Sequence, residues 1–203
     1  VYLPNRVVPM LPEKLSNQLC SLRPNEEKLC YSVIFEINNK AEVLSHWFGR
    51  TIIKSHKRFT YEEVQQIIDQ KEGPQVDELL LLNNLAQQLR TARFQEGSIN
   101  FDREEIRFVF DSEGKPTGIF CDESNEAHQL IEEFMLLANK TVAEYIGKRK
   151  GRPKTFVYRI HDKPNKEKLD KFATFIRRFG YKINRASNKS ISASINLLLS
   201  RST

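Results

Sequence analysis

The chain has 203 residues, of which 39% are hydrophobic and 29% are charged, and its formal net charge is +6. This length is enough for one large domain or two small ones, and the composition excludes disordered and fibrous proteins. The apolar runs are far shorter than the roughly 20 residues of a membrane-spanning helix, and no signal peptide is visible. We therefore expect a cytoplasmic protein with no membrane partner.

Cysteine spacing and net charge bear on which metal, redox and anion-binding sites the chain could form. Cys20, Cys30 and Cys121 form no C-x-x-C pair, so neither a zinc knuckle nor a redox dithiol is predicted. Free thiols in a reducing compartment fit best. The excess of Lys and Arg is compatible with a polyanionic partner, and equally with an ordinary, mildly basic cytosolic protein.

The first half of the chain predicts extended segments followed by two helices. Four prolines within residues 1–24 prevent a regular helix there, apart from one helical turn at 13–19. A hairpin is expected next, because its two strands are rich in β-branched and aromatic residues. Thr60 and Glu63 form a capping box at the start of the first helix. The expected hairpin strands are 31–37 and 42–54, and the expected helices are 61–70 and 76–95.

The second half predicts another hairpin, a long helix, a short strand and two further helices. The long helix is apolar over much of its circumference, so we expect it to be well buried. These elements are expected at 105–110, 117–121, 125–147, 156–160, 165–179 and 190–199. The chain lacks the strand–helix–strand rhythm of a parallel sheet, so the expected fold class is α+β, with antiparallel hairpins packed against several helices.

No self-contained active site is visible. A two-metal nuclease needs clustered carboxylates, whereas the aspartates are isolated and adjacent glutamates on a helix point about 100° apart. The four histidines lack metal-ligand spacing, and no serine lies in G-x-S-x-G. We therefore expect no catalytic residue and no metal ligand in this chain.

Basic and aromatic residues leave two interpretations open. The basic stretch at 148–154 fits phosphate contacts, and it fits equally a solvated loop whose cations favour the end of the preceding helix. Tyr2, Trp47, Phe94 and Phe101 are able to stack on bases, but aromatics at strand spacing are also common in cores. Composition and spacing do not decide between these interpretations.

Five ordered segments carry a resemblance to a known family. They are YLPNR with PMLP and LCSL (2–22), I-x-S-x-x-R-x-T-Y-E (53–62), L-A-x-x-L-R-x-x-R-x-x-x-G-x-I-x-F (85–101), LIEEFMLLAN (130–139), and YRIH with PNKEKL (158–169). Together they resemble the RNB catalytic domain of the ribonuclease II/ribonuclease R exoribonucleases. The spacing is closer to that of the bacterial ribonuclease R branch.

The resemblance implies that residues 1–203 are the central part of one RNB catalytic domain, truncated at both ends. The parent enzyme would be a processive, Mg²⁺-dependent 3′→5′ exoribonuclease that hydrolyses single-stranded RNA to nucleoside 5′-monophosphates, and we expect a monomer. The family's metal-binding aspartates belong before Tyr2 and its catalytic arginine after Thr203, so the fragment itself is expected to be inactive. The alternative is a non-catalytic RNA-binding or protein-interaction module.

The resemblance also implies three RNA-binding residues. Tyr2 matches the aromatic that stacks on the 3′-terminal base, and Phe101 matches the aromatic at the other end of the stacked nucleotides. Glu132 matches the acidic residue that contacts the sugar. Glu132 shares a helix face with residues 136 and 139, whereas the neighbouring Glu133 points elsewhere and is predicted to be structural.

Overall fold

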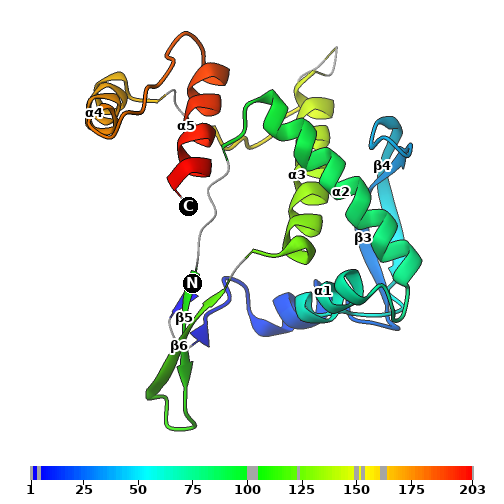
Figure 1. Ribbon diagram of the computed structural model, residues 1–203. Helices are drawn as coiled ribbons and strands as arrows, with labels where there is room; N and C mark the ends of the chain where they lie inside the picture. The colour runs from blue at the N-terminus through cyan, green and yellow to red at the C-terminus, as the bar shows by residue number, and fades with distance from the viewer. Residues whose placement is uncertain are drawn as a thin grey trace. The chain divides into compact units, whose positions relative to one another are not determined.

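The computed structural model describes residues 2–3, 6–99, 105–122, 124–148, 151, 154–160 and 164–202. The chain divides into two compact units, one of Val1–Ala86 and Arg103–Glu132, the other of Gln87–Asp102 and Glu133–Thr203. Two long helices, α2 (Val76–Glu96) and α3 (Glu126–Gly147), contribute residues to both units (Figure 1).

The first unit opens with irregular chain, as the prolines predict. The two short strands β1 (Tyr2–Leu3) and β2 (Arg6–Val7) pair antiparallel. A single π-helical segment, η1 (Lys14–Leu19), confirms the predicted helical turn. No residue of η1 is buried.

A long hairpin follows, formed by β3 (Glu27–Ile37) and β4 (Val43–Lys54) in antiparallel pairing. The Asn38 side chain closes its turn, because Asn38 Oδ1 accepts hydrogen bonds from the backbone amides of Lys40 at 2.9 Å and Glu42 at 3.0 Å. An asparagine side chain that bonds the backbone two residues ahead is typical of such turns. The predicted hairpin is confirmed.

The helix α1 (Tyr61–Gln70) begins at the predicted capping box. Thr60 Oγ1 accepts a hydrogen bond from the Glu63 amide at 3.2 Å, and the Glu63 carboxylate accepts one from the Thr60 amide at 2.7 Å. The box satisfies two backbone donors that the helix itself leaves unpaired. Ile67 and Ile68 are buried.

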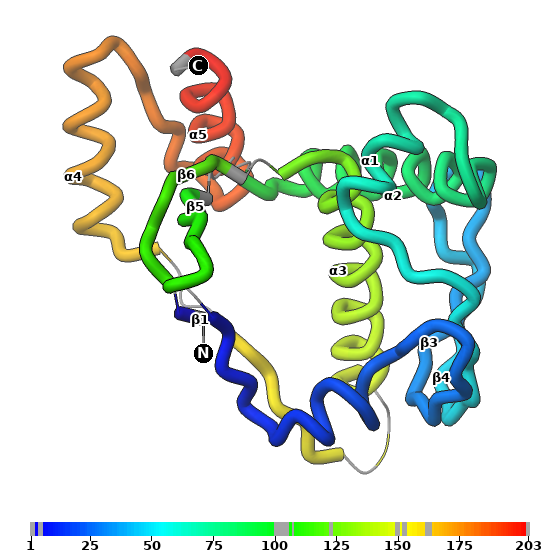
Figure 2. The backbone as a smooth tube through the Cα atoms, turned by 90° about the horizontal axis from the view of Figure 1, so that it is seen from below, coloured from blue at the N-terminus to red at the C-terminus, as the bar shows by residue number. Residues whose placement is uncertain are grey.

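The second predicted hairpin is also present. Strands β5 (Glu105–Phe110) and β6 (Pro116–Asp122) pair antiparallel and lie side by side in both views (Figure 1; Figure 2). Asp111 Oδ1 closes the turn by accepting from the amides of Glu113 at 2.9 Å and Lys115 at 2.8 Å. Local side-chain chemistry thus specifies both hairpin turns.

The second unit contains the last two helices. Asn165 caps α4 (Lys166–Arg177), because its Oδ1 accepts from the Lys168 amide at 3.0 Å. The helix α5 (Asn188–Ser202) extends beyond the predicted 190–199 at both ends. Asn196 on α5 donates a hydrogen bond to the Ser98 carbonyl at 2.8 Å, which ties this helix to the segment after α2.

Two sequence predictions are wrong. Residues 156–160 do not form a strand, because extended chain becomes a strand only when it finds a hydrogen-bonded partner, and none is present among the described residues. The helix α3 is not well buried. Its buried residues form one stripe, Ala127, Leu130 and Glu133, whereas Ile131 and Met135 remain about half exposed.

The described residues confirm the α+β class, with three two-stranded antiparallel sheets and a set of helices. Within the described residues, no helix has the length and hydropathy needed to cross a membrane.

Thr60→Ala should lower the free energy of unfolding by about 1 kcal/mol, because the first turn of α1 loses its side-chain acceptor. Thr91→Ala is the matched control: this exposed threonine bonds the Gln87 carbonyl within α2, and alanine is favourable in a helix interior. Urea unfolding followed by circular dichroism gives both values. Equal losses would contradict the capping role.

Candidate nucleic-acid interface

The first turn of α3 is held by side chains from α1 and α2. Asn83 donates through Nδ2 to the Glu126 carboxylate at 2.7 Å, and Asn83 is buried. Gln65 Oε1 accepts from the Ala127 amide at 3.1 Å, which satisfies one of the backbone donors left unpaired at the start of a helix. These two bonds fix the position of α3 within the first unit.

An aromatic pair continues this contact. The Tyr61 ring from the start of α1 stacks on the His128 ring of α3, with ring centroids 4.0 Å apart and an interplanar angle of 16°. The His128 Nδ1 lies 2.7 Å from Asn125 Oδ1, so a second contact orients the imidazole. His128 is thus a partly buried residue whose ring contacts are structural.

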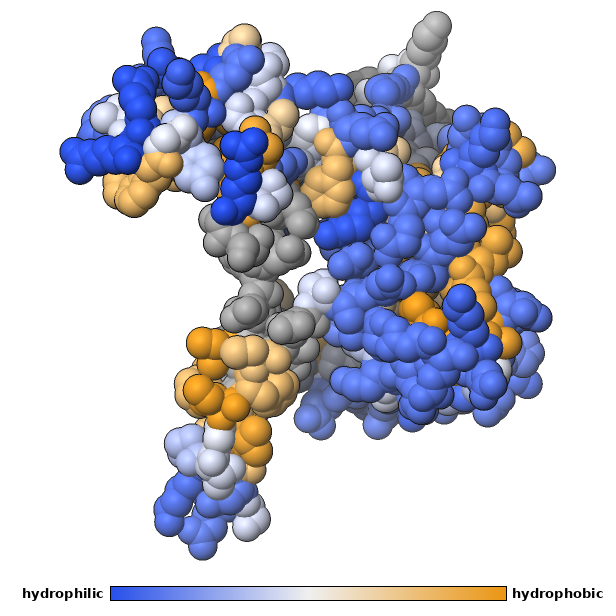
Figure 3. Space-filling view, in the orientation of Figure 1, coloured by the Kyte–Doolittle hydropathy of each residue, from blue (hydrophilic) through white to orange (hydrophobic). Residues whose placement is uncertain are grey.

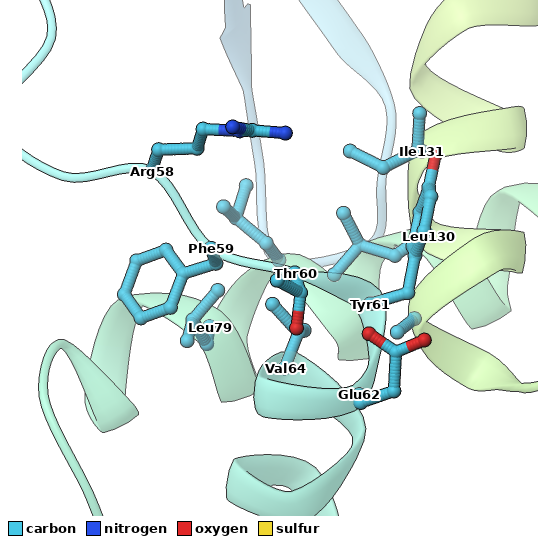
Figure 4. A pocket seen from close by; sticks show the side chains of 11 residues that line it. Arg58, Phe59, Thr60, Tyr61, Glu62, Val64, Leu79, Leu130 and Ile131 are labelled. Carbon is cyan, nitrogen blue, oxygen red and sulfur yellow. The ribbon is translucent and has the colours of Figure 1, made fainter. Parts of the chain in front are cut away.

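A largely apolar cavity of about 530 Å³ lies beside this pair. In Figure 4 the Tyr61 ring stands next to Leu130 and Ile131 of α3, while Arg58 extends over one side of the cavity. The lining residues are Arg58, Phe59, Thr60, Tyr61, Glu62, Val64, Leu79, Leu82, Ala127, Leu130 and Ile131. Sequence reasoning missed this cavity. Its wall includes residues of the segments 53–62 and 130–139. Both segments carry the family resemblance, and that was the one sequence signal that could have pointed to the cavity.

Glu132 follows the cavity residue Ile131 and lies one turn after His128. Its side chain is half-buried, and the positions that share its helix face, Leu136 and Asn139, are exposed. This face has the geometry that the sequence predicted. Glu132 thus lies on α3 one turn from the aromatic pair.

Glu133 lies on a different face of α3 and forms a buried ion cluster in the second unit. Its side chain is 3% exposed, and both carboxylate oxygens accept from Arg93 Nε, at 3.0 and 3.1 Å. Arg90 Nη1 lies 3.6 Å from the same carboxylate. The predicted structural role of Glu133 is confirmed, and its arginines come from the segment 85–101.

The same two arginines contact the ring of Phe94. The guanidinium groups of Arg90 and Arg93 lie 4.8 and 5.0 Å from the centre of the Phe94 ring, which is the range of a cation–π contact. Phe94 thus supports the ion cluster.

The Trp47 ring packs over Gly49 on the hairpin, where an added Cβ would lie 2.0 Å from the indole.

The side chains of the other predicted RNA-binding residues, Tyr2 and Phe101, lie outside the described part of the structure. The backbone of Tyr2 lies in β1, and its side chain falls outside the described atoms. Phe101 lies outside the described residues, as do residues 149–150 and 152–153 of the basic stretch. Within the described ranges no group of three or more His, Cys, Asp or Glu is able to hold a metal ion. The described residues therefore do not fit a Mg²⁺ site.

Comparison with protein families gives one match over nearly the whole chain. The model described as "RNB domain" matches residues 1–202. Among curated proteins, ribonuclease R of Escherichia coli (strain K12) is 36% identical over 189 residues, which cover 90% of this chain and 23% of that protein. DIS3-like exonuclease 2 of Schizosaccharomyces pombe is 33% identical over 96% of this chain and 22% of its own length. The chain thus spans about a quarter of the relatives that it matches.

Solved structures agree with this match. RNase R of Mycoplasma genitalium, in complex with ribose-methylated single-stranded RNA, superposes with a TM-score of 0.87 at 27% identity, covering 97% of this chain and 32% of that chain. Yeast Ssd1, described as a pseudonuclease, superposes with a TM-score of 0.69 at 19% identity, covering 96% of this chain and 24% of that chain. The second likeness shows the fold alone.

Glu133→Gln should lower the free energy of unfolding by roughly 3 kcal/mol, because two largely buried guanidinium groups lose their counter-charge. The matched control is Glu132→Gln, one residue earlier on the same helix, which we expect to cost less than about 1 kcal/mol. Urea unfolding of the two variants against wild type makes the comparison. A larger loss for Glu132→Gln would reverse the two assignments.

Proposed function

The chain belongs to the RNB domain family, and on this premise we propose that it is part of an exoribonuclease that removes nucleotides from the 3′ end of single-stranded RNA. The supports are the family match over residues 1–202 and the identity with ribonuclease R. Because the chain spans about a quarter of those relatives, the activity is proposed for the complete protein. This chain's part would be to bind and orient the RNA.

The observation that supports the residue assignments is the different surroundings of two adjacent glutamates. Glu133 is fully engaged by Arg93 and Arg90, whereas Glu132 lies half-buried on another face of α3. We assign Glu132 to the ribose, because a carboxylate accepts the hydrogen bond that a 2′-hydroxyl donates, and DNA lacks that hydroxyl. The Tyr61–His128 pair one turn away would flank the same nucleotide.

Tyr2 and Phe101 are assigned to the bases on the strength of the resemblance. A ring that stacks on a base tolerates every sequence, because all four bases present a π-face. Sequence tolerance is what an enzyme needs when it degrades many RNAs from their ends. Tyr2 would hold the 3′-terminal base, and Phe101 would close the other end of the stacked nucleotides.

Metal dependence belongs to the complete enzyme in this proposal, where Mg²⁺ would stabilise charge on the reacting phosphate. We expect that enzyme to be a cytoplasmic monomer. The second candidate is a non-catalytic RNA-binding or protein-interaction module, the alternative that the sequence leaves open. The two differ in whether the complete protein releases mononucleotides from 3′-labelled RNA with Mg²⁺. Failure to do so would favour the second.

In the complete enzyme, Tyr2→Ala should leave long RNA degradable but lengthen the final product. Stacking on the terminal base contributes roughly 1–3 kcal/mol, and a short RNA has few other contacts to retain it. Tyr2→Phe is the control and should resemble wild type, since stacking uses the ring. Product length on a denaturing gel, together with a melting curve, gives the result. An unchanged end product with a lower melting temperature would assign Tyr2 to the core instead.

A further inference from the structure

The net positive charge of this chain is concentrated toward its C-terminal end. Residues 1–147 carry a formal charge of −7, residues 148–163 carry +6, and residues 164–202, with nine Lys and Arg and two acidic residues, carry +7. The last segment comprises α4, α5 and the loop between them. A charge so localised indicates a polyanionic partner at this part of the chain.

The only two carboxylates of this segment are already neutralised within it. Glu167 pairs with Lys171 Nζ at 2.6 Å, and Asp170 pairs with Arg185 from the loop after α4. An approaching phosphate would therefore meet no uncompensated negative charge.

The cations at the C-terminal end of α4 are available. Arg177, Arg178 and Lys182 are exposed, and none of them has a carboxylate within 4.0 Å among the described residues. Surface lysines and arginines without acidic partners exchange small counterions for phosphates at little cost, and the released counterions favour binding.

Two exposed aromatic rings lie next to these cations in the chain. Phe175 and Phe179 are 55% and 64% exposed, and their ring centroids lie 5.3 Å apart. The helix buries Ala173 and Ile176 instead, so these phenylalanines point away from its core side. In Figure 3 hydrophobic side chains lie between strongly hydrophilic ones over α4, at the upper left.

We propose that this α4 surface, formed by Phe175, Arg177, Arg178, Phe179 and Lys182, is a second binding site for single-stranded RNA. The cations bind phosphates and the rings stack on bases. A duplex fits less well, because its bases are stacked on one another and do not reach the rings. The choice of RNA rests on the proposed function, but the surface does not include Glu132.

The test measures binding of a fluorescent 12-nucleotide single-stranded RNA by anisotropy, at several salt concentrations. Against wild type, the triple variant Arg177→Gln, Arg178→Gln, Lys182→Gln should weaken binding and reduce the slope of log K against log salt by about 2, since each single-strand phosphate contact contributes roughly 0.7. The matched control replaces the exposed Lys40, Lys54 and Lys71 by Gln and should leave the slope unchanged.

A second variant tests stacking. Phe175→Leu with Phe179→Leu keeps an apolar surface but removes the rings, and it should weaken RNA binding roughly fivefold or more with an unchanged salt slope. Circular dichroism checks that each variant folds. A duplex of equal length should compete poorly with the single strand.

Several outcomes would overturn the proposal. One is wild-type affinity in both α4 variants. Another is a duplex that competes equally while the leucine variant binds normally, which would leave only nonspecific attraction. An acidic peptide that requires the three cations, when RNA does not, would assign the surface to a protein. Loss of RNA binding in Glu132→Gln, with no effect of the α4 variants, would retain the proposed function and reject this second site.

Discussion

The arrangement of α2 and α3 in the second unit depends on one buried carboxylate. Glu133 is 3% exposed, and an unpaired charge at such a position would be strongly destabilising. The helices must therefore meet where Arg93 and Arg90 reach it. This contact also sets the rotation of α3 about its axis. Because successive helical residues are about 100° apart, fixing Glu133 inward turns Glu132 to a different face.

The other end of α3 is fixed by different chemistry. In the first unit, Asn83 and Gln65 hold its first turn through hydrogen bonds, and Tyr61 stacks on His128. Glu132 follows directly in the chain and is thereby placed beside an aromatic pair and an apolar cavity. The α4 surface differs from this site, because its cations and rings are exposed and nothing in the described structure covers them. A fixed carboxylate suits recognition of one sugar, whereas exposed cations and rings suit a polymer of any sequence.

Local chemistry was predictable from the sequence, and tertiary burial was not. The Thr60–Glu63 capping box and both hairpins depend on residues close in the chain, and the structure contains them. The strand at 156–160 is absent because strand formation needs a partner that the local pattern does not supply. The helix α3 is apolar over much of its circumference but buried on one stripe, because its neighbours cover one side. The cavity beside Tyr61 joins segments about 70 residues apart, which spacing alone does not reveal. The roles of Tyr2, Phe101 and Glu132 in RNA binding remain predictions from the resemblance.

The central claim is that two adjacent glutamates have separate tasks, and carboxyl NMR measures it most directly. With ¹³C-labelled glutamate, the resonances of Glu132 and Glu133 are assigned by substitution and followed while a short single-stranded RNA is added. We predict that the carboxyl resonance of Glu132 shifts when RNA is added but not when DNA of the same sequence is added. The carboxyl resonance of Glu133 should not shift with either. A shift at Glu133 with none at Glu132, or the same Glu132 shift with DNA, would contradict the claim.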